Sequence, residues 1–284
     1  MTTPQVKREL RSPREIRKMR RAGLVVWQSH QAAYRILKAG VTTAELNRVY
    51  RDTFSEFEAT PLFLNYGPGD NPFPAETCIS VNEELVHGIP GPRVIENGDI
   101  VSLDTGCSID SWCGDAAITH AIGEITPAAK KLLVVTHKTL ELAIELLSSK
   151  NLWSEIATEM QAFVEDHGFS VVKELTGHGI GRKLHEPPQA PNYWAEEFSN
   201  NDDFDIRPGV VFACEPMVHQ GTDEIEVLGD QWTTVTADRK LCAHYEHTIA
   251  ITKDGPVRLT GPPNGDELEL VGEDFRFAEQ WVKW

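Results

Sequence analysis

The chain has 284 residues, of which 40% are hydrophobic and 25% are charged. These are ordinary values for a globular protein, and a chain of this length can bury a sizeable core. The net charge of −16 argues against a protein whose whole surface binds DNA or RNA.

No apolar run reaches the length that a membrane span requires, and the N-terminus lacks the apolar segment of a signal peptide. The five cysteines, at positions 78, 107, 113, 214 and 242, include no C-x-x-C pair. Their odd number and spacing disfavour a disulfide framework and a cysteine-rich zinc site. We therefore expect a cytoplasmic protein with buried thiols and no contact with DNA or a membrane.

The N-terminal segment is basic, in contrast to the rest of the chain. Residues 1–21 contain eight basic and two acidic residues, which leaves 19 basic and 41 acidic residues beyond them. A basic run of this kind is most often a solvated helix face, and docking on ribosomal RNA is the alternative. Residues 1–11 would form a basic extension ahead of the first predicted helix.

In chain order, the first predicted elements are two helices. The segments 12–15 and 42–45 each have the Ser/Thr-x-x-Glu pattern of a capping box, and a proline follows Ser12. Apolar residues at helical spacing continue the first helix to Gly40 and the second to about Glu58. From residue 75 to 122, short β-rich runs broken by Gly, Pro and Asn predict antiparallel strands.

The second half of the chain repeats this order. Thr126 and the proline after it open a helix that extends to about Ser148, and another helix runs from about Ser154 to His167. Stretches that are typical of β-strands follow at 169–175, 209–219, 225–229 and 243–252.

Residue types in the two parts also match weakly at an offset of 110, as in Glu45-Leu46 and Glu155-Ile156. The repeated order predicts an α+β fold with two related halves, at about 12–125 and 126–253, that face each other across a cleft. We expect one catalytic domain at 12–260, followed by an acidic tail at 261–284.

Asp104 and Asp115 lie on two neighbouring strand-like runs. If Ile109-Asp110 forms the turn of a hairpin, the two aspartates face each other, with Cβ atoms about 4.5–5.5 Å apart. Two carboxylates this close repel each other unless a cation lies between them. The alternative is a different register that leaves both side chains in solvent.

Three further residues of types that bind metals lie later in the chain. His178 lies in a Gly-His-Gly-Ile-Gly segment, which would be a loop that allows close approach to the histidine, although a loop histidine is more often merely solvated. Glu215 ends an apolar run before a proline, and Glu246 lies in the last β-like stretch. With the two aspartates, this set is too rich in oxygen for a structural zinc site. It suits two divalent ions (Mn²⁺, Fe²⁺, Co²⁺ or Zn²⁺) bridged by carboxylates, as in aminopeptidases.

Five segments together resemble the motifs of type I methionine aminopeptidases: residues 78–90, 99–115, 177–181, 215–218 and 245–248. The resemblance extends from about Ser12 to Lys253. It implies the pita-bread fold, with two pseudo-symmetric halves whose antiparallel strands are covered by helices. Only 36 residues lie between His178 and Glu215, which leaves no room for the large insertion of type II enzymes.

The resemblance also implies roles for individual residues. The metal ligands would be Asp104, Asp115, His178, Glu215 and Glu246. Among them, Asp115 and Glu246 would bridge the two ions, and Glu215 would also act as general base. His87 would contact the substrate around its scissile amide, and His185 would stabilise the tetrahedral oxyanion.

The specificity pocket departs from the family pattern. Cys78 and Trp232 match family pocket residues, whereas Phe73 stands where a tyrosine is usual and Leu184 where a phenylalanine is usual. Residues 67–71 resemble an insertion. Because apolar residues replace apolar residues, we still expect a pocket for methionine.

These features predict an enzyme that removes the N-terminal methionine from nascent polypeptides. The resemblance implies that it is a monomer and that the second residue of its substrates is small. One alternative is an Xaa-Pro aminopeptidase or prolidase on the same fold, although such chains usually carry a separate N-terminal domain. The other is a non-catalytic binding member of the family, although such members typically lose metal ligands.

Overall fold

The computed structural model describes residues 9–195, 198 and 203–263, so most of the predicted basic extension and acidic tail lies outside the described residues. Four helices are present in these ranges: α1 (Pro13–Ile36), α2 (Thr43–Glu56), α3 (Pro127–Leu146) and α4 (Trp153–Asp166). The strands are β1 (Thr60–Pro61), β2 (Cys78–Val81), β3 (Glu84–Val86), β4 (Ile100–Ile109), β5 (Trp112–Ala121), β6 (Ser170–Val171), β7 (Gly177–Gly179), β8 (Glu186–Ala190), β9 (Val211–Cys214), β10 (Met217–His219), β11 (Ile225–Val227), β12 (Thr234–Thr236), β13 (Cys242–His244), β14 (His247–Thr252) and β15 (Gly255–Arg258).

The helices begin where the sequence predicts them. Ser12 and Thr42 each form a complete capping box with the glutamate three residues later, and the Thr126 side chain accepts a hydrogen bond from the backbone of Ala129. Helix α1 ends four residues before the predicted Gly40, because Leu37 already has an extended backbone.

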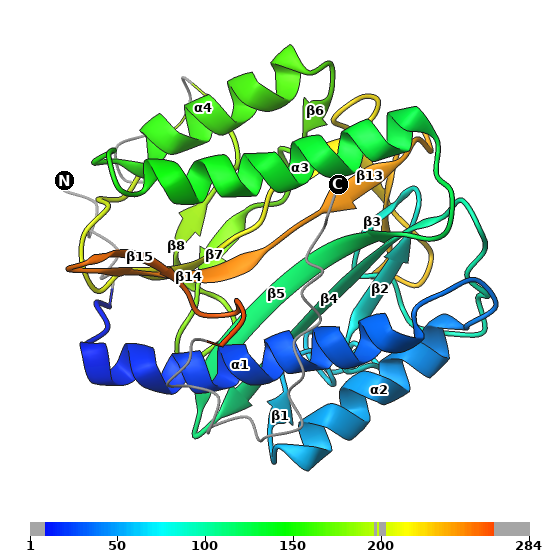
Figure 1. Cartoon of the computed structure of the whole chain (residues 1–284), viewed down its shortest axis with the longest axis horizontal. Helices are drawn as coiled ribbons and strands as arrows, with labels where there is room; N and C mark the ends of the chain where they lie inside the picture. Colours follow the sequence, from blue (N-terminus) through cyan, green and yellow to red (C-terminus); the bar gives the residue numbers. More distant parts are fainter. Residues whose placement is uncertain (1–8, 196–197, 199–202, 264–284) are drawn as a thin grey trace.

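The two helix pairs cover opposite sides of the strands. In Figure 1, α1 and α2 lie below the strands and α3 and α4 lie above them. All strand pairings are antiparallel, and the two largest sheets have the orders β1-β4-β2, with β5 paired to β4, and β15-β14-β9-β7-β8. One hydrophobic core lies under α1 and α2 and another under α3 and α4, which agrees with the predicted α+β halves.

The β4–β5 hairpin forms, but its predicted register was wrong by two residues. The turn is Asp110-Ser111, in which both residues have left-handed φ angles of 51° and 60°. A turn at Ile109-Asp110 would require this conformation of a β-branched residue, which is strongly disfavoured. Asp104 therefore pairs with Ala117, and Asp115 pairs with Gly106. Since Asp104 and Gly106 share a face of β4, the two aspartates still lie on the same face, in a diagonal relation.

Several strands also differ from the expectation. The Gly-His-Gly segment, predicted as a loop, is strand β7, which lies between β8 and β9 in the sheet. The sequence analysis also missed β1, β8, β12 and β15. Glycine and proline are depleted in strands, so β1, β7, β8 and β15 are recognisable as strands only from their neighbours in the sheet. Strand β12 contains neither residue and has only three residues.

Helix α1 packs closely against segments from both halves of the chain. A Cβ atom at Gly23 would lie 2.0 Å from the carbonyl oxygen of Leu259, and one at Gly114 would lie 2.8 Å from the backbone nitrogen of Gly23. One turn earlier on the helix, the Arg20 guanidinium donates hydrogen bonds to the carbonyl oxygens of Leu259 and Gly261. The helix backbone thus touches both the hairpin and the segment that follows β15.

We expect Gly23→Ala to destabilise the protein by about 1–3 kcal/mol, because the added methyl group cannot avoid a backbone carbonyl. Helix propensity alone would give the opposite sign, with a stabilisation of about 1 kcal/mol. The free energy of unfolding, measured by urea denaturation, distinguishes destabilisation from stabilisation. Gly69→Ala is the control, since a Cβ there finds no atom within 4 Å. A more stable Gly23→Ala protein would contradict the close approach.

Candidate metal centre

A cavity between the two halves contains every residue that the sequence analysis proposed as a metal ligand. Asp104 lies on β4, Asp115 on β5 and His178 in the middle of β7. Glu215 follows β9, and Glu246 lies in the short break between β13 and β14. The structure therefore brings together five side chains that are up to 142 residues apart in the sequence.

Hydrogen bonds across the halves fix these elements beside each other. The backbone amides of Ala117 and Glu246 each donate to the carbonyl oxygen of the other residue. The Thr248 hydroxyl accepts a hydrogen bond from the backbone amide of Asp115 and donates one to its carbonyl oxygen. The carboxylates of β5 and of the β13–β14 break are thus placed by paired backbone contacts rather than by a mobile loop.

The His178 imidazole is oriented toward the carboxylates. Its Nδ1 lies 3.0 Å from the carbonyl oxygen of Gly179 and donates to it in the neutral ring. The lone pair is then on Nε2, which lies 3.5 Å from Glu215 Oε1 and 4.0 Å from Asp115 Oδ2. This orientation is typical of metal-binding histidines, whose second nitrogen donates to a backbone carbonyl or a carboxylate.

The electrostatics of the cavity favour a bound cation. Burial raises the pKa of all four carboxyl groups, and the charges of neighbouring carboxylates raise the pKa of Asp104, Glu215 and Glu246 further. Among the described residues, no Lys or Arg pairs with any of the four. One oxygen each of Asp104, Asp115 and Glu246 is buried without a hydrogen-bond partner. Divalent ions would satisfy these oxygens and neutralise the charges, so the residues present fit a metal centre.

Potential ligand atoms form two overlapping groups. Asp115, His178 and Glu246 offer atoms within 4.8 Å of one another, and so do Glu215, His244 and Glu246. Glu246 belongs to both groups, as a bridging ligand would. Asp104 belongs to neither, but its side chain lines the same cavity.

The sequence analysis missed His244. This residue ends β13 and is buried, and its Nε2 lies 3.5 Å from Glu215 Oε2. Glu215 therefore lies between two imidazoles, one near each carboxylate oxygen. The available signal was the spacing of His244 from Glu246, because residues two apart in an extended segment share a side.

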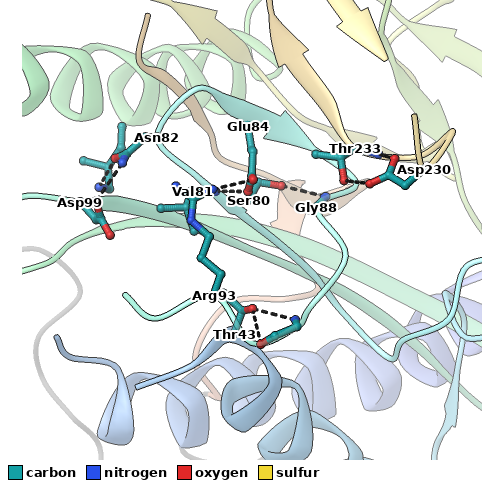
Figure 2. A network of polar contacts seen from close by, with 12 residues as sticks. Thr43, Ser80, Val81, Asn82, Glu84, Gly88, Arg93, Asp99, Asp230 and Thr233 are labelled. Carbon is teal, nitrogen blue, oxygen red and sulfur yellow. Dashed lines mark hydrogen bonds and ion pairs between the residues drawn. The ribbon is translucent and has the colours of Figure 1, made fainter. Parts of the chain in front are cut away.

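His87 lies at the cavity in a tightly held turn. The residue has a left-handed φ of 58°, and a Cβ on the following Gly88 would lie 2.3 Å from the carbonyl oxygen of Ile79. The Gly88 amide donates to the Ser80 hydroxyl, as Figure 2 shows. Burial lowers the pKa of His87 to about 4, so the ring is neutral at pH 7.

Hydrogen bonds also fix the segments before and after this turn. Glu84 accepts hydrogen bonds from the backbone amide of Val81 and from Arg93 (Figure 2). The Thr43 hydroxyl exchanges hydrogen bonds with the backbone of Gly91. Residues on both sides of His87 are therefore fixed to β2 and to the start of α2.

His185 lines the same cavity. Its ring contacts that of His178, with centroids 4.2 Å apart, and its Nδ1 lies 2.5 Å from the Tyr66 hydroxyl. The following residue, Glu186, accepts hydrogen bonds from the backbone amides of Arg182 and Lys183.

The predicted pocket residues line an apolar part of the cavity. Phe73, Cys78 and Leu184 are buried, and the Phe73 ring meets that of Trp232 edge to face at 5.3 Å. The sequence analysis did not identify Phe63 and assigned no role to Tyr66; both residues also line the cavity.

The apparent insertion at 67–71 packs against the pocket. A Cβ on Gly67 would lie 2.5 Å from the Trp232 ring, and the Trp232 indole nitrogen donates to the carbonyl oxygen of Asn71 at 3.1 Å. The insertion therefore positions one wall of the pocket.

Comparison with known proteins agrees with this geometry. Residues 17–253 match metallopeptidase family M24. The chain belongs to this family. Within M24 it falls among the methionine aminopeptidases: it is 42% identical over 245 residues to "Methionine aminopeptidase 1" of Bacillus subtilis, a match that covers 86% of this chain and 96% of the relative. A methionine aminopeptidase of Aquifex aeolicus is 41% identical over 255 residues, which cover 89% of this chain and 98% of the relative.

Solved M24 structures confirm the predicted pita-bread fold. The methionine aminopeptidase of Thermotoga maritima superposes with a TM-score of 0.84 at 37% identity and covers 90% of this chain and 100% of its own. The prolidase of Pyrococcus furiosus shares the fold alone, with a TM-score of 0.69, 19% identity, and coverage of 90% of this chain and 66% of its own. Of the described helices, none has the length and apolar character needed to cross a membrane.

We expect Mn²⁺ to stabilise the protein, by about 2.7 kcal/mol at a concentration 100 times its Kd, because it binds the folded state. Asp115→Asn should abolish most of this gain while leaving the metal-free protein at least as stable, since it removes one repelling charge. Thermal unfolding with and without Mn²⁺ measures both effects. Asp52→Asn, at an exposed position, is the control. An equal metal-dependent gain in the Asp115 variant would contradict the proposed ligand set.

Proposed function

We propose that this protein is a methionine aminopeptidase, which removes the N-terminal methionine from polypeptides with a small second residue. The observation that supports this most strongly is the convergence of His178 and four carboxylates, three buried and one (Glu215) largely buried, beside an apolar pocket. The relatives named methionine aminopeptidase, with matches along nearly their whole length, support the same function. The prolidase alternative rests on similarity of fold alone.

The metal centre would contain two divalent ions, of Mn²⁺, Fe²⁺, Co²⁺ or Zn²⁺, bound by Asp104, Asp115, His178, Glu215 and Glu246. When bound, such a pair of ions supplies a nucleophilic water near neutral pH and polarises the scissile carbonyl. Asp115 and Glu246 would bridge the ions, in agreement with the presence of Glu246 in both groups of ligand atoms.

The protein's own residues would move the protons and hold the peptide. Glu215 would accept a proton from the attacking water and return it to the leaving amine. His185 would donate a hydrogen bond to the developing oxyanion, and His87 would contact the scissile amide. The side chain of the first residue would lie among Phe73, Cys78, Leu184 and Trp232.

We further propose that residues 12–260 work as one catalytic domain, since α1 and the segment after β15 hold the halves together. The enzyme would act as a monomer in the cytoplasm on nascent polypeptides. The basic segment would contact the ribosome.

The structure reduces the number of basic residues that are free to contact the ribosome. Arg11 is buried and pairs with Glu186, Arg20 donates to backbone carbonyls, and Arg21 pairs with Asp110 at 2.9 Å. Arg14 and Arg17 are exposed, while Lys7 and Arg8 lie outside the described residues.

Replacing Glu215 by Gln should lower kcat by about 10²-fold or more, the usual scale for a general base. The variant should remain folded, because amide and carboxyl groups have similar size. Steady-state hydrolysis of Met-Ala-Ser and circular dichroism measure the two properties, with the exposed Glu124→Gln as control. A near-wild-type kcat with metal bound would show that Glu215 is not the base.

The apolar pocket should prefer methionine, whose flexible thioether adapts to irregular cavities. Leu184 is smaller than a phenylalanine, so leucine should be released slowly. One methylene changes specificity by only about 10–200-fold. The measurement is release of the first residue from Met-Ala-Ser, Leu-Ala-Ser and Ala-Pro-Ala. Faster cleavage of Ala-Pro-Ala than of Met-Ala-Ser would replace the proposal with the Xaa-Pro alternative.

Reversing Arg14 and Arg17 to Glu should weaken co-sedimentation with ribosomes and leave kcat/KM on a free tripeptide unchanged. Salt should weaken the wild-type interaction, because binding releases counterions from RNA and this release is less favourable at a higher salt concentration. Arg48→Glu with Arg35→Glu, at exposed positions outside the basic segment, is the control. Unchanged sedimentation of the Arg14 and Arg17 variant at low salt would show that these charges are only solvated.

A further inference from the structure

Tyr66 and His185 form a side-chain contact between two separate segments that line the cavity. The Tyr66 hydroxyl lies 2.5 Å from His185 Nδ1, and the two rings meet edge to face with centroids 5.4 Å apart. The residues are 119 positions apart in the sequence, and both line the cavity. No other hydrogen bond of the His185 ring is found among the described residues.

The backbone on each side of this contact is fixed independently. The Glu186 carboxylate accepts hydrogen bonds from Arg182 and Lys183, and it pairs with the buried Arg11. The Tyr66 backbone pairs with that of Phe73, whose amide donates to the Tyr66 carbonyl oxygen at 2.8 Å. The hydrogen bond therefore joins two anchored segments and restricts the rotation of the His185 ring.

The direction of this hydrogen bond decides what His185 can do. A neutral imidazole has one donor nitrogen and one acceptor nitrogen. If the phenol donates to Nδ1, the proton of the ring is on Nε2, which is then free to donate a hydrogen bond. If Nδ1 donates to the phenol instead, Nε2 is an acceptor and cannot stabilise an oxyanion. Burial raises the pKa of Tyr66, so the phenol keeps its proton at neutral pH.

We propose that Tyr66 is a positioning residue for His185: its hydroxyl donates to Nδ1 and holds the Nε2–H group toward the scissile carbonyl oxygen. This inference rests on the proposed function, in which His185 donates to the oxyanion. It gives the Tyr66 hydroxyl a role in turnover, separate from the apolar pocket that binds the first side chain.

Kinetics of the metal-loaded full chain test the proposal. Tyr66→Phe removes only the hydroxyl and should lower kcat on Met-Ala-Ser about tenfold at an unchanged KM. This is less than the 10²–10³-fold typical of losing an oxyanion donor itself, which we expect for His185→Ala. Tyr34→Phe is the matched control, because Tyr34 is 41% exposed and Tyr66 is 40% exposed, and Tyr34 lies on α1.

A double-mutant cycle separates positioning from a general structural effect. If Tyr66 acts through His185, the double variant Tyr66→Phe, His185→Ala should be no slower than His185→Ala alone. Independent effects would multiply instead. Multiplication of the two losses, or a wild-type kcat in Tyr66→Phe, overturns the proposal.

Nitrogen NMR of the zinc-loaded protein, labelled with ¹⁵N-histidine, supplies a readout besides activity. The wild type should show His185 with an unprotonated Nδ1 and a protonated Nε2, and the Nδ1 signal should move in Tyr66→Phe. A proton on Nδ1 overturns the proposal. If the wild type does not cleave Met-Ala-Ser, the proposed function fails, while the NMR result still decides the direction of the hydrogen bond.

Discussion

The constraint on which the rest of this structure depends is the burial of four carboxylates in one cavity. Asp104, Asp115, Glu215 and Glu246 come from four separate segments, and no Lys or Arg among the described residues pairs with them. Such a cluster is unfavourable on its own, because each burial disfavours the charged form and each neighbour adds repulsion. Bound divalent ions would turn the same arrangement into a favourable one, so that metal binding and the folded state would support each other.

The fold meets this constraint by holding the two halves rigidly against each other. Backbone hydrogen bonds link Ala117 with Glu246, Thr248 holds both backbone groups of Asp115, and Gly23 lets α1 approach the segment after β15. Ligands on strands and short breaks keep their spacing better than ligands on loops. The same rigidity holds His87 and His185 at the cavity that the carboxylates line.

Much of the site was predictable because its signals are local. Acidic residues in apolar strands need partners, and the capping boxes at Ser12 and Thr42 define helix starts. The register of the hairpin was not predictable from alternation, since a shift by two residues keeps every side chain on its face; only the left-handed turn at Asp110-Ser111 decides it. The contacts of His244 and Tyr66, and the packing of Gly67 on Trp232, arise between distant segments and leave no periodic trace in the sequence.

The most direct test of the account is anomalous diffraction from crystals grown with Mn²⁺. We predict two peaks in the cavity, about 3.5–4 Å apart as in other two-metal sites, with Glu246 in contact with both. One peak lying beside Asp115 and His178, with none near Glu215, would contradict the dinuclear centre. The absence of any peak at saturating Mn²⁺ would contradict the claim that these buried carboxylates are there to bind metal.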